Sequence, residues 1–385
     1  MDYNEQIIEK WDQLNLNENL LRGIYAYGFD EPSEIQKKAI RPIIDKRDVI
    51  AQAQSGCGKT GSFSIGALQT VDLTCTAPQI LILSPTHELV KQTAQVITDI
   101  GSYLDGLVVK TLIGGSSIRE DIRFLQDKSP HIIVGTVGRV LDMIEKKYLP
   151  VDQLNLMILD EADEMLSQGF SEKIKYLFQH FLPVKMQVVL FSATIPQEII
   201  EVSKHFMNNT VQILMEREKL SLQCIQQYYI AVENDQAKYN ALQDLFTIMN
   251  VSKCIIYCNS VNRVNELHNS MINDGYSVVA IHSNMNKSDR QNIFRQFRTG
   301  DSRFLISSDV TARGIDIQQV SAVINFDLSR NVHTYLHRIG RSGRWGRRGI
   351  AINFVSRFDV RDLRNIENYY KIQINELPEH FNGDV

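Results

Sequence analysis

The sequence predicts an α/β protein with two tandem domains, each a mostly parallel sheet flanked by helices. Three observations lead to this prediction. Short apolar runs rich in valine and isoleucine recur along the chain, helix-like stretches separate them, and the charged segment "MEREKLSLQ" at 215–223 divides them into two series. Nearly continuous apolar runs are typical of strands covered on both faces, and their alternation with helices favours parallel pairing.

The runs predict the order of the strands. In the first half of the chain they are 47–52, 79–85, 131–136, 155–163 and 187–194, and in the second half 253–260, 276–282, 303–309, 322–327 and 351–356. The two series predict one domain over 1–214 and another over 224–385, with 215–223 as the linker.

Composition narrows the class of protein. The 385 residues are 43% hydrophobic and 22% charged, with a formal net charge of −4, which is ordinary for a globular protein. A local basic patch is compatible with this balance, because net charge sums over faces that a ligand never touches. The N-terminus is too acidic and polar for a signal peptide, and no apolar run is long enough to span a bilayer. We therefore expect a soluble intracellular protein.

The cysteines predict neither a zinc site nor a disulfide framework. There are five of them, an odd number, without zinc-type spacing: Cys57, Cys75, Cys224, Cys254 and Cys258. Cys254 and Cys258 lie in the apolar run "KCIIYC", so we expect buried, reduced thiols there.

The stretch "AQAQSGCGKT" at 51–60 predicts a phosphate-binding loop. It stands between a strand-like and a helix-like run and fits A-x-x-x-x-G-K-T from Ala53. The amides of such a loop and the N-terminus of its helix bind phosphates. Lys59 is expected to reach the β- and γ-phosphates, and the Thr60 hydroxyl to bind Mg²⁺. The other residues expected to contact the nucleotide are Ser55, Gly56, Cys57 and Gly58, with Cys57 contributing only its backbone.

In "LMILDEAD", four apolar residues are followed directly by two acidic ones, Asp160 and Glu161. Asp160 is the expected Mg²⁺ partner, partly through water, and Glu161 is a candidate general base for an attacking water. Small-molecule kinases also carry phosphate-binding loops, so this pair leaves the reaction open.

The letters of this run, Asp160-Glu161-Ala162-Asp163, spell DEAD, and further motifs stand around them in order. They are "GFDEPSEIQ", "PTHEL", "TVGR", "FSAT", "SSDVTARGID" and "YLHRIGRSGRWGRRG". The chain resembles, over essentially its full length, the DEAD-box RNA helicases of superfamily 2. Within them it is most similar to the translation initiation factor 4A subfamily, which includes a nuclear exon-junction paralogue. The resemblance implies two RecA-like domains, the first binding ATP.

The resemblance assigns roles around the nucleotide. Phe29 would stack on adenine and Gln36 would hydrogen-bond its edge, with Trp11 supporting their loop. Asp316 would contact the ribose. Ser192 and Thr194 would couple the DEAD acids, including Asp163, to RNA-induced domain closure, and His337 and Arg338 of the second domain belong to the same coupling set.

The resemblance also assigns an RNA site and two arginine fingers. Arg341 and Arg344 would reach the γ-phosphate, where planar cations stabilise the transition state. The RNA-binding residues implied are Pro85, Thr86, Gly114, Gly115, Thr136 and Arg139 in the first domain, and Ser308, Arg313 and Gly314 in the second. Arg139 could instead anchor a helix end. Contacts to phosphates and 2′-hydroxyls predict sequence-independent binding of single-stranded or weakly paired RNA.

Three functions remain after this comparison of motifs. The favoured one is an ATP-dependent RNA helicase, an RNA-stimulated ATPase that unwinds short duplexes locally in translation initiation on mRNA 5′ regions. The alternative is an ATP-locked RNA clamp in a nuclear exon-junction or ribosomal-RNA-processing complex. A small-molecule P-loop enzyme is disfavoured by the arginine motif. The favoured function implies a cytoplasmic monomer, away from membranes, that binds a helical-repeat scaffold of the initiation-factor-4G type.

Three residues depart from the family pattern. The family usually has Arg at His87, Pro at Val137 and Thr at Ser308, and the last change keeps the hydroxyl. Val137 lacks the fixed φ of proline, so its loop could be looser. Imidazole is mostly uncharged near neutral pH, so His87 predicts weaker and more pH-dependent RNA binding than in relatives. Lys91, one turn further on, could compensate.

Overall fold

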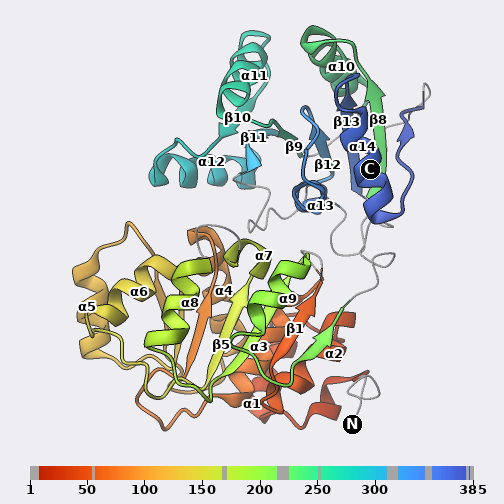
Figure 1. Cartoon of the computed structure of the whole chain (residues 1–385). Helices are drawn as coiled ribbons and strands as arrows, with labels where there is room; N and C mark the ends of the chain where they lie inside the picture. The colour runs from red at the N-terminus through yellow and green to blue at the C-terminus, as the bar shows by residue number, and fades with distance from the viewer. Residues whose placement is uncertain are drawn as a thin grey trace. The chain divides into compact units, whose positions relative to one another are not determined.

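The computed structural model divides into two compact units, Met1–Met215 and Glu216–Val385. It describes residues 8–53, 57–166, 171–214, 225–249, 253–309, 320–342, 349–378 and 381. Each unit is a seven-stranded sheet with helices packed on its faces (Figure 1). The neighbouring strands in these ranges all pair in parallel. The predicted fold class is confirmed. The proposed linker lies outside the described residues, so the predicted boundaries stay a prediction.

The sheet of the first unit has the strand order β3-β4-β2-β5-β6-β1-β7. Its strands are β1 (Val49–Gln52), β2 (Ile80–Leu83), β3 (Val109–Leu112), β4 (Ile132–Gly135), β5 (Leu156–Asp160), β6 (Gln187–Ser192) and β7 (Val211–Ile213). Its helices are the 3₁₀ helix η2 (Trp11–Leu14), α1 (Glu18–Ala26), α2 (Glu34–Ile44), α3 (Lys59–Thr70), α4 (His87–Ile100), α5 (Ile118–Asp127), α6 (Val137–Glu145), α7 (Ala162–Met165), α8 (Ser171–His180) and α9 (Gln197–Ser203).

Successive side chains of the central strands enter two different cores. In β2, Ile80 and Ile82 pack into the cluster formed with α1 to α4, whereas Leu81 and Leu83 pack into the cluster formed with α6 to α9. A strand's side chains alternate between the faces of its sheet, so a strand covered on both faces must be apolar throughout. This is why the central strands appear in the sequence as unbroken apolar runs.

The second unit repeats this plan with the strand order β10-β11-β9-β12-β13-β8-β14. Its strands are β8 (Ile225–Ala231), β9 (Cys254–Tyr257), β10 (Val278–Ile281), β11 (Phe304–Ser307), β12 (Ala322–Asn325), β13 (Gly349–Val355) and β14 (Asn375–Glu376). Its helices are α10 (Asp235–Ile248), α11 (Val261–Asn273), α12 (Lys287–Thr299), α13 (Val332–Ile339) and α14 (Val360–Tyr370). Cys254 and Cys258 are fully buried free thiols of this sheet, and burial raises the pKa of both.

All ten predicted strands are present, and the described residues form four others that were not predicted. β3, β7 and β14 lie at or near sheet edges and are short or polar, as the central pair Lys110 and Thr111 of β3 illustrates. β8 carries Gln226 and Gln227 in its first half, which interrupts the apolar run. Among the described helices, none combines the length and the hydropathy needed to cross a membrane.

Gly23 fixes how α1 packs against α4. A Cβ at this position would stand 1.8 Å from the carbonyl oxygen of Ile100, the last residue of α4. Backbone atoms cannot move aside as the end of a flexible side chain can, so only glycine allows the two helices to approach this closely.

We therefore expect Gly23→Ala to lower the free energy of unfolding of the first unit by about 3 kcal/mol. Gly138→Ala is the matched control, because its Cβ would enter open space near the start of α6 and alanine favours a helix by up to about 1 kcal/mol. Urea denaturation followed by fluorescence of the buried Trp11, with Trp345 replaced by phenylalanine, measures both changes. Equal stability of the two alanine variants would contradict the packing described.

Candidate nucleotide and nucleic-acid site

The strand order of the first unit sorts the predicted site residues into two groups at one edge of the sheet. Carboxyl ends of parallel strands meet at the same edge. The residues assigned to the phosphates and to Mg²⁺ follow β1 and β5, with β6 between these strands. The residues assigned to RNA follow β2, β3 and β4, which are adjacent to one another. β5 borders both groups, since it lies between β2 and β6.

The phosphate-binding loop leads into α3 through a glycine that the backbone requires. Gly58 is the N-cap of α3 with φ 95°, a left-handed conformation that favours glycine. The start of α3 offers free amides and partial positive charge, and Lys59 and Thr60 are its first two residues. Of the predicted loop residues, Ser55 and Gly56 lie outside the described ranges, while Cys57 is described and half-buried.

The segment predicted to read adenine lies against this loop. The Ser33 hydroxyl donates a hydrogen bond of 2.8 Å to the carbonyl of Cys57. The side chains of Phe29 and Gln36 come so close to α3 that a Cβ at Gly61 would meet them at 2.8 and 2.7 Å. The structure therefore brings the two predicted adenine contacts to the N-terminus of the phosphate-binding helix.

Trp11 holds Phe29 from behind. Its indole Nε1 donates a hydrogen bond of 3.0 Å to the carbonyl of Phe29, and its ring is 1% exposed. A buried indole normally needs such a partner. The contact fixes the backbone at Phe29, which is the supporting role expected of Trp11.

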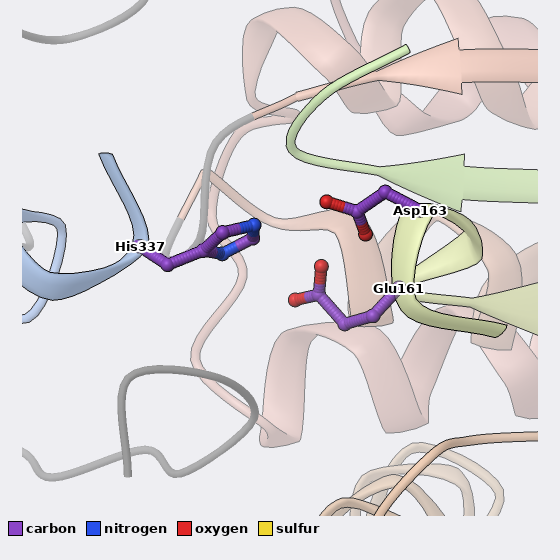
Figure 2. Close-up of side chains that lie close together, drawn as sticks. All are labelled: Glu161, Asp163 and His337. Carbon is purple, nitrogen blue, oxygen red and sulfur yellow. The ribbon is translucent and has the colours of Figure 1, made fainter. Parts of the chain in front are cut away.

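An ion pair joins the loop to the acidic strand. Lys59 Nζ lies 3.1 Å from Glu161 Oε1, and both side chains are buried. Glu161 is the N-cap of α7 and has φ 49°, a left-handed conformation that is unusual for a residue other than glycine. Backbone strain of this kind is typical of functional sites. Figure 2 shows the carboxylates of Glu161 and Asp163 projecting to the same side; His337, also labelled there, belongs to α13 of the second unit.

Asp160 is suited to bind a divalent cation. Burial, followed by the charge of Glu161, raises the pKa of Asp160 from its ordinary value to about 7. Within the ranges that the structure describes, its Oδ1 accepts a hydrogen bond from the Glu161 amide and its Oδ2 accepts none. Carboxylate and hydroxyl oxygens are the ligands that Mg²⁺ prefers, so Asp160 and Thr60 fit the predicted metal site.

The predicted coupling residues of the first unit are bonded to one another. The Thr194 hydroxyl donates a hydrogen bond of 2.7 Å to Asp163 Oδ2. Ser192 Oγ accepts hydrogen bonds from the amides of Asp163 and Thr194, each at 3.3 Å. The segment after β6 is therefore tied to the start of α7, two residues from Glu161.

The residues assigned to RNA in the first unit cap helices and form a tight turn. Thr86 caps α4, its hydroxyl accepting from the Leu89 amide, and Thr136 is the N-cap of α6. Gly115 has φ 73°, and a Cβ on Gly114 would lie 3.5 Å from His87 Nε2. Two of the assigned segments therefore meet, with His87 between them.

Arg139 and Val137 are held inside the unit. The Arg139 guanidinium pairs with Asp121 and donates a hydrogen bond of 2.9 Å to the Ser116 carbonyl, next to the glycine turn. These contacts are those of an anchor, and a direct contact with RNA stays a prediction. Val137 begins α6 and is 1% exposed, so packing holds the helix start where the family has proline.

In the second unit, the carboxyl ends of three strands converge on Arg338. This arginine is fully buried on α13, and its Nε pairs with Asp309 at 2.6 Å. Arg341 follows α13, and its Nε donates a hydrogen bond of 3.1 Å to the His337 carbonyl. Ser308 is buried after β11. The remaining predicted residues of this unit lie outside the described ranges: Arg313, Gly314, Asp316 and Arg344.

Comparisons with known proteins agree with this architecture. Residues 33–202 match the DEAD/DEAH box helicase family and residues 237–346 match the helicase conserved C-terminal domain. A relative from Eremothecium gossypii, named ATP-dependent RNA helicase eIF4A, is 50% identical over 374 residues, covering 97% of this chain and 94% of the relative. The chain belongs to the DEAD-box helicase family.

Two further relatives define the place of this DEAD-box helicase in its family. The Saccharomyces cerevisiae (strain YJM789) protein of the same name is 49% identical, covering 97% of this chain and 94% of the relative. Among solved structures, S. cerevisiae Dbp5 bound to RNA and ADP BeF3 is 33% identical with a TM-score of 0.88, covering 96% of each chain. The predicted membership of the initiation factor 4A type and the tandem RecA-like fold are confirmed.

Sequence reasoning missed several partners of the site residues in this helicase. Ser33 lies in the motif "GFDEPSEIQ", but the motif predicts no contact for it, although Ser33 and Gln36 form the S-x-x-Q capping box that starts α2. That local signal locates the helix start but not the bond to Cys57. Asp121 and Asn259, the partners of Arg139 and Arg338, had no assigned role because no local pattern predicts contacts between distant residues.

The raised pKa of Asp160 predicts that this acid opposes folding at neutral pH. Because its native pKa, about 7, exceeds that of the unfolded chain, about 4, the native state loses stability as pH rises between these values. Without nucleotide, we expect Asp160→Asn to raise the free energy of unfolding at pH 8 by about 1–3 kcal/mol and to change little at pH 4. Denaturation at both pH values measures this, and no gain at pH 8 would contradict the burial argument.

The position of His87 predicts that a charge there strengthens RNA binding. We expect His87→Arg to lower the Kd for single-stranded RNA about three- to tenfold at low salt and to steepen the log–log salt dependence by up to ~0.7. The control is His180→Arg, at the exposed end of α8, because the C-terminal end of a crossover helix lies at the opposite edge of the sheet. Fluorescence anisotropy across a salt series measures both variants. Identical slopes for His87→Arg and the parent protein would reject the hypothesis.

Proposed function

We propose that this DEAD-box protein is an RNA-stimulated ATPase that unwinds short RNA duplexes locally during translation initiation. One observation carries the proposal. Glu161, which pairs with Lys59 at the nucleotide loop, lies two residues from Asp163, which bonds Thr194 after β6. The hydrolytic acid and the coupling contact therefore share one short segment, at the end of the strand that borders the RNA half of the sheet.

The proposal gives each residue of the nucleotide site a role. Lys59 and the amides at the start of α3 hold the phosphates, and Phe29 and Gln36 select adenine. Glu161 accepts the proton of the attacking water. Asp160 and Thr60 hold Mg²⁺, which neutralises phosphate charge when bound.

The second unit contributes cations and a further RNA contact. Arg341 and Arg344 stabilise the charge that develops on the transferred phosphoryl group. Ser308, Arg313 and Gly314 contact the RNA backbone, and Asp316 contacts the ribose of ATP. His337 and Arg338 link the nucleotide to RNA. ATP and RNA then each use residues from both units, so each raises the affinity for the other.

The relatives support the proposed setting of the reaction. Those compared carry the name eIF4A at 49–50% identity over 97% of this chain, which favours translation initiation over the nuclear clamp. The proposal places the helicase in the cytoplasm with a helical-repeat scaffold of the initiation-factor-4G type. Its RNA ligands are single-stranded or weakly paired, since the assigned contacts are to the backbone.

ATP turnover with and without single-stranded RNA tests the proposal. We expect RNA to stimulate turnover severalfold. Glu161→Gln should lower kcat at least about 100-fold while fluorescent-ATP binding is kept, because the amide preserves the shape but not the basicity. Glu172→Gln, at an exposed position on α8, is the matched control.

Two outcomes would overturn the proposal. Turnover that is indifferent to RNA would indicate an enzyme acting on a small molecule. A long-lived RNA complex that retains ATP, with slow phosphate release, would indicate the clamp.

A further inference from the structure

A polar cluster at the carboxyl ends of β9 and β12 surrounds the buried Arg338 of the second unit. The Arg338 guanidinium donates hydrogen bonds to Asn259 Oδ1 at 2.8 Å, to the Asp327 carbonyl at 2.8 Å and to Asn325 Oδ1 at 3.3 Å. With the Asp309 pair, these contacts hold Arg338 from the ends of β9, β11 and β12. The angle of α13 is therefore set by three strand ends together.

Asn259 follows β9 in this cluster. Two hydrogen bonds of its own hold it in place, one from its side chain and one from its backbone. Its side-chain amide Nδ2 donates a hydrogen bond of 2.9 Å to the Leu328 carbonyl, so the oxygen of the same amide faces Arg338. Its backbone amide donates to Asp327 Oδ2 at 3.2 Å. Rotation of the side chain would break one bond whenever it broke the other.

The Asp327 carboxylate is itself held in place by cations. It accepts from Arg263 Nε at 2.7 Å and from Lys238 Nζ at 3.1 Å, and it is 6% exposed. Burial alone would raise its pKa, but the hydrogen bonds from Arg263 and the charges of Lys238 and Arg263 lower it. The carboxylate therefore stays ionised. Arg263 also donates from Nη2 to Asp327 Oδ1 at 2.9 Å, so this arginine alone holds both carboxylate oxygens and supports Asn259 without Lys238.

We propose that Asn259 is a positioning residue: it sets the orientation of α13 and thereby of Arg341, which follows this helix. The inference rests on the proposed function, because it takes Arg341 to act on the transition state. Arg341 lies about one helical turn after Arg338, and its Nε donates a hydrogen bond to the His337 carbonyl. A turn of α13 that follows the loss of the Asn259 contact must move Arg341 as well.

Because Asn259 is exposed, its role in positioning α13 can be tested separately from a contribution to stability. An apolar replacement of similar size, Asn259→Leu, leaves no cavity in the core and denies Arg338 one acceptor. Asn259→Asp keeps the shape and restores the acceptor for Arg338, but it gives up the donor to the Leu328 carbonyl. Lys238→Met removes a buried ion pair with the carboxylate of Asp327 but contacts neither Asn259 nor Arg338 in the described part of the chain.

Steady-state ATPase kinetics of the full chain, with saturating single-stranded RNA, test the inference. We expect Asn259→Leu to lower kcat about tenfold, the rate equivalent of one hydrogen bond to a charged group, with KM for ATP and Kd for RNA within twofold of the parent. Asn259→Asp should recover part of the lost kcat, because its carboxylate accepts from Arg338 but cannot donate to the Leu328 carbonyl. Lys238→Met should lower the melting temperature at least as much as Asn259→Leu and leave kcat within twofold.

Each outcome has one meaning. A parent protein whose ATPase ignores RNA contradicts the proposed function. An RNA-stimulated parent whose Asn259→Leu variant keeps its kcat overturns the role of Asn259. Equal losses of kcat in Asn259→Leu, Asn259→Asp and Lys238→Met also overturn it, because they indicate general destabilisation.

Discussion

The ion pair between Lys59 and Glu161 joins the ends of two strands that are not neighbours in the sheet. β1 and β5 are separated by β6, so a contact across their ends ties the start of α3 to the start of α7. Both partners are buried, and removing one partner of a buried pair typically costs about 3–5 kcal/mol. The geometry of the nucleotide site therefore depends on this pair, which orients the side chain of Glu161.

Other contacts extend this arrangement outward from the ion pair. Trp11 holds the carbonyl of Phe29, Ser33 holds the phosphate loop at Cys57, and Thr194 holds Asp163. Each joins segments that lie far apart in the sequence. A nucleotide that displaced Lys59 from Glu161 would thus act on a connected set of contacts that reaches from η2 to the segment after β6.

Much of the fold and the chemistry could be predicted because both leave local signals. Buried strands show as apolar runs, and the residues around Gly58 and Asp160 follow such runs directly. The edge strand β3 was missed because its central residues, Lys110 and Thr111, are polar and only half-buried, so no apolar run marks the strand. The supports of the site were missed for another reason: Asn259 and Asp327 are 68 positions apart, and a contact between such residues depends on strand order.

The order of strands in the first unit also bears on how such a protein diverges. The departures at His87 and Val137 follow β2 and β4, whereas the residues assigned to the phosphates and to Mg²⁺ follow β1 and β5. If the residues after β2 and β4 bind RNA as proposed, substitutions among them can change RNA affinity while the proposed phosphate-binding residues in the other half of the sheet stay the same. Related helicases could in this way differ in how long they stay bound to RNA while keeping the same site for ATP hydrolysis.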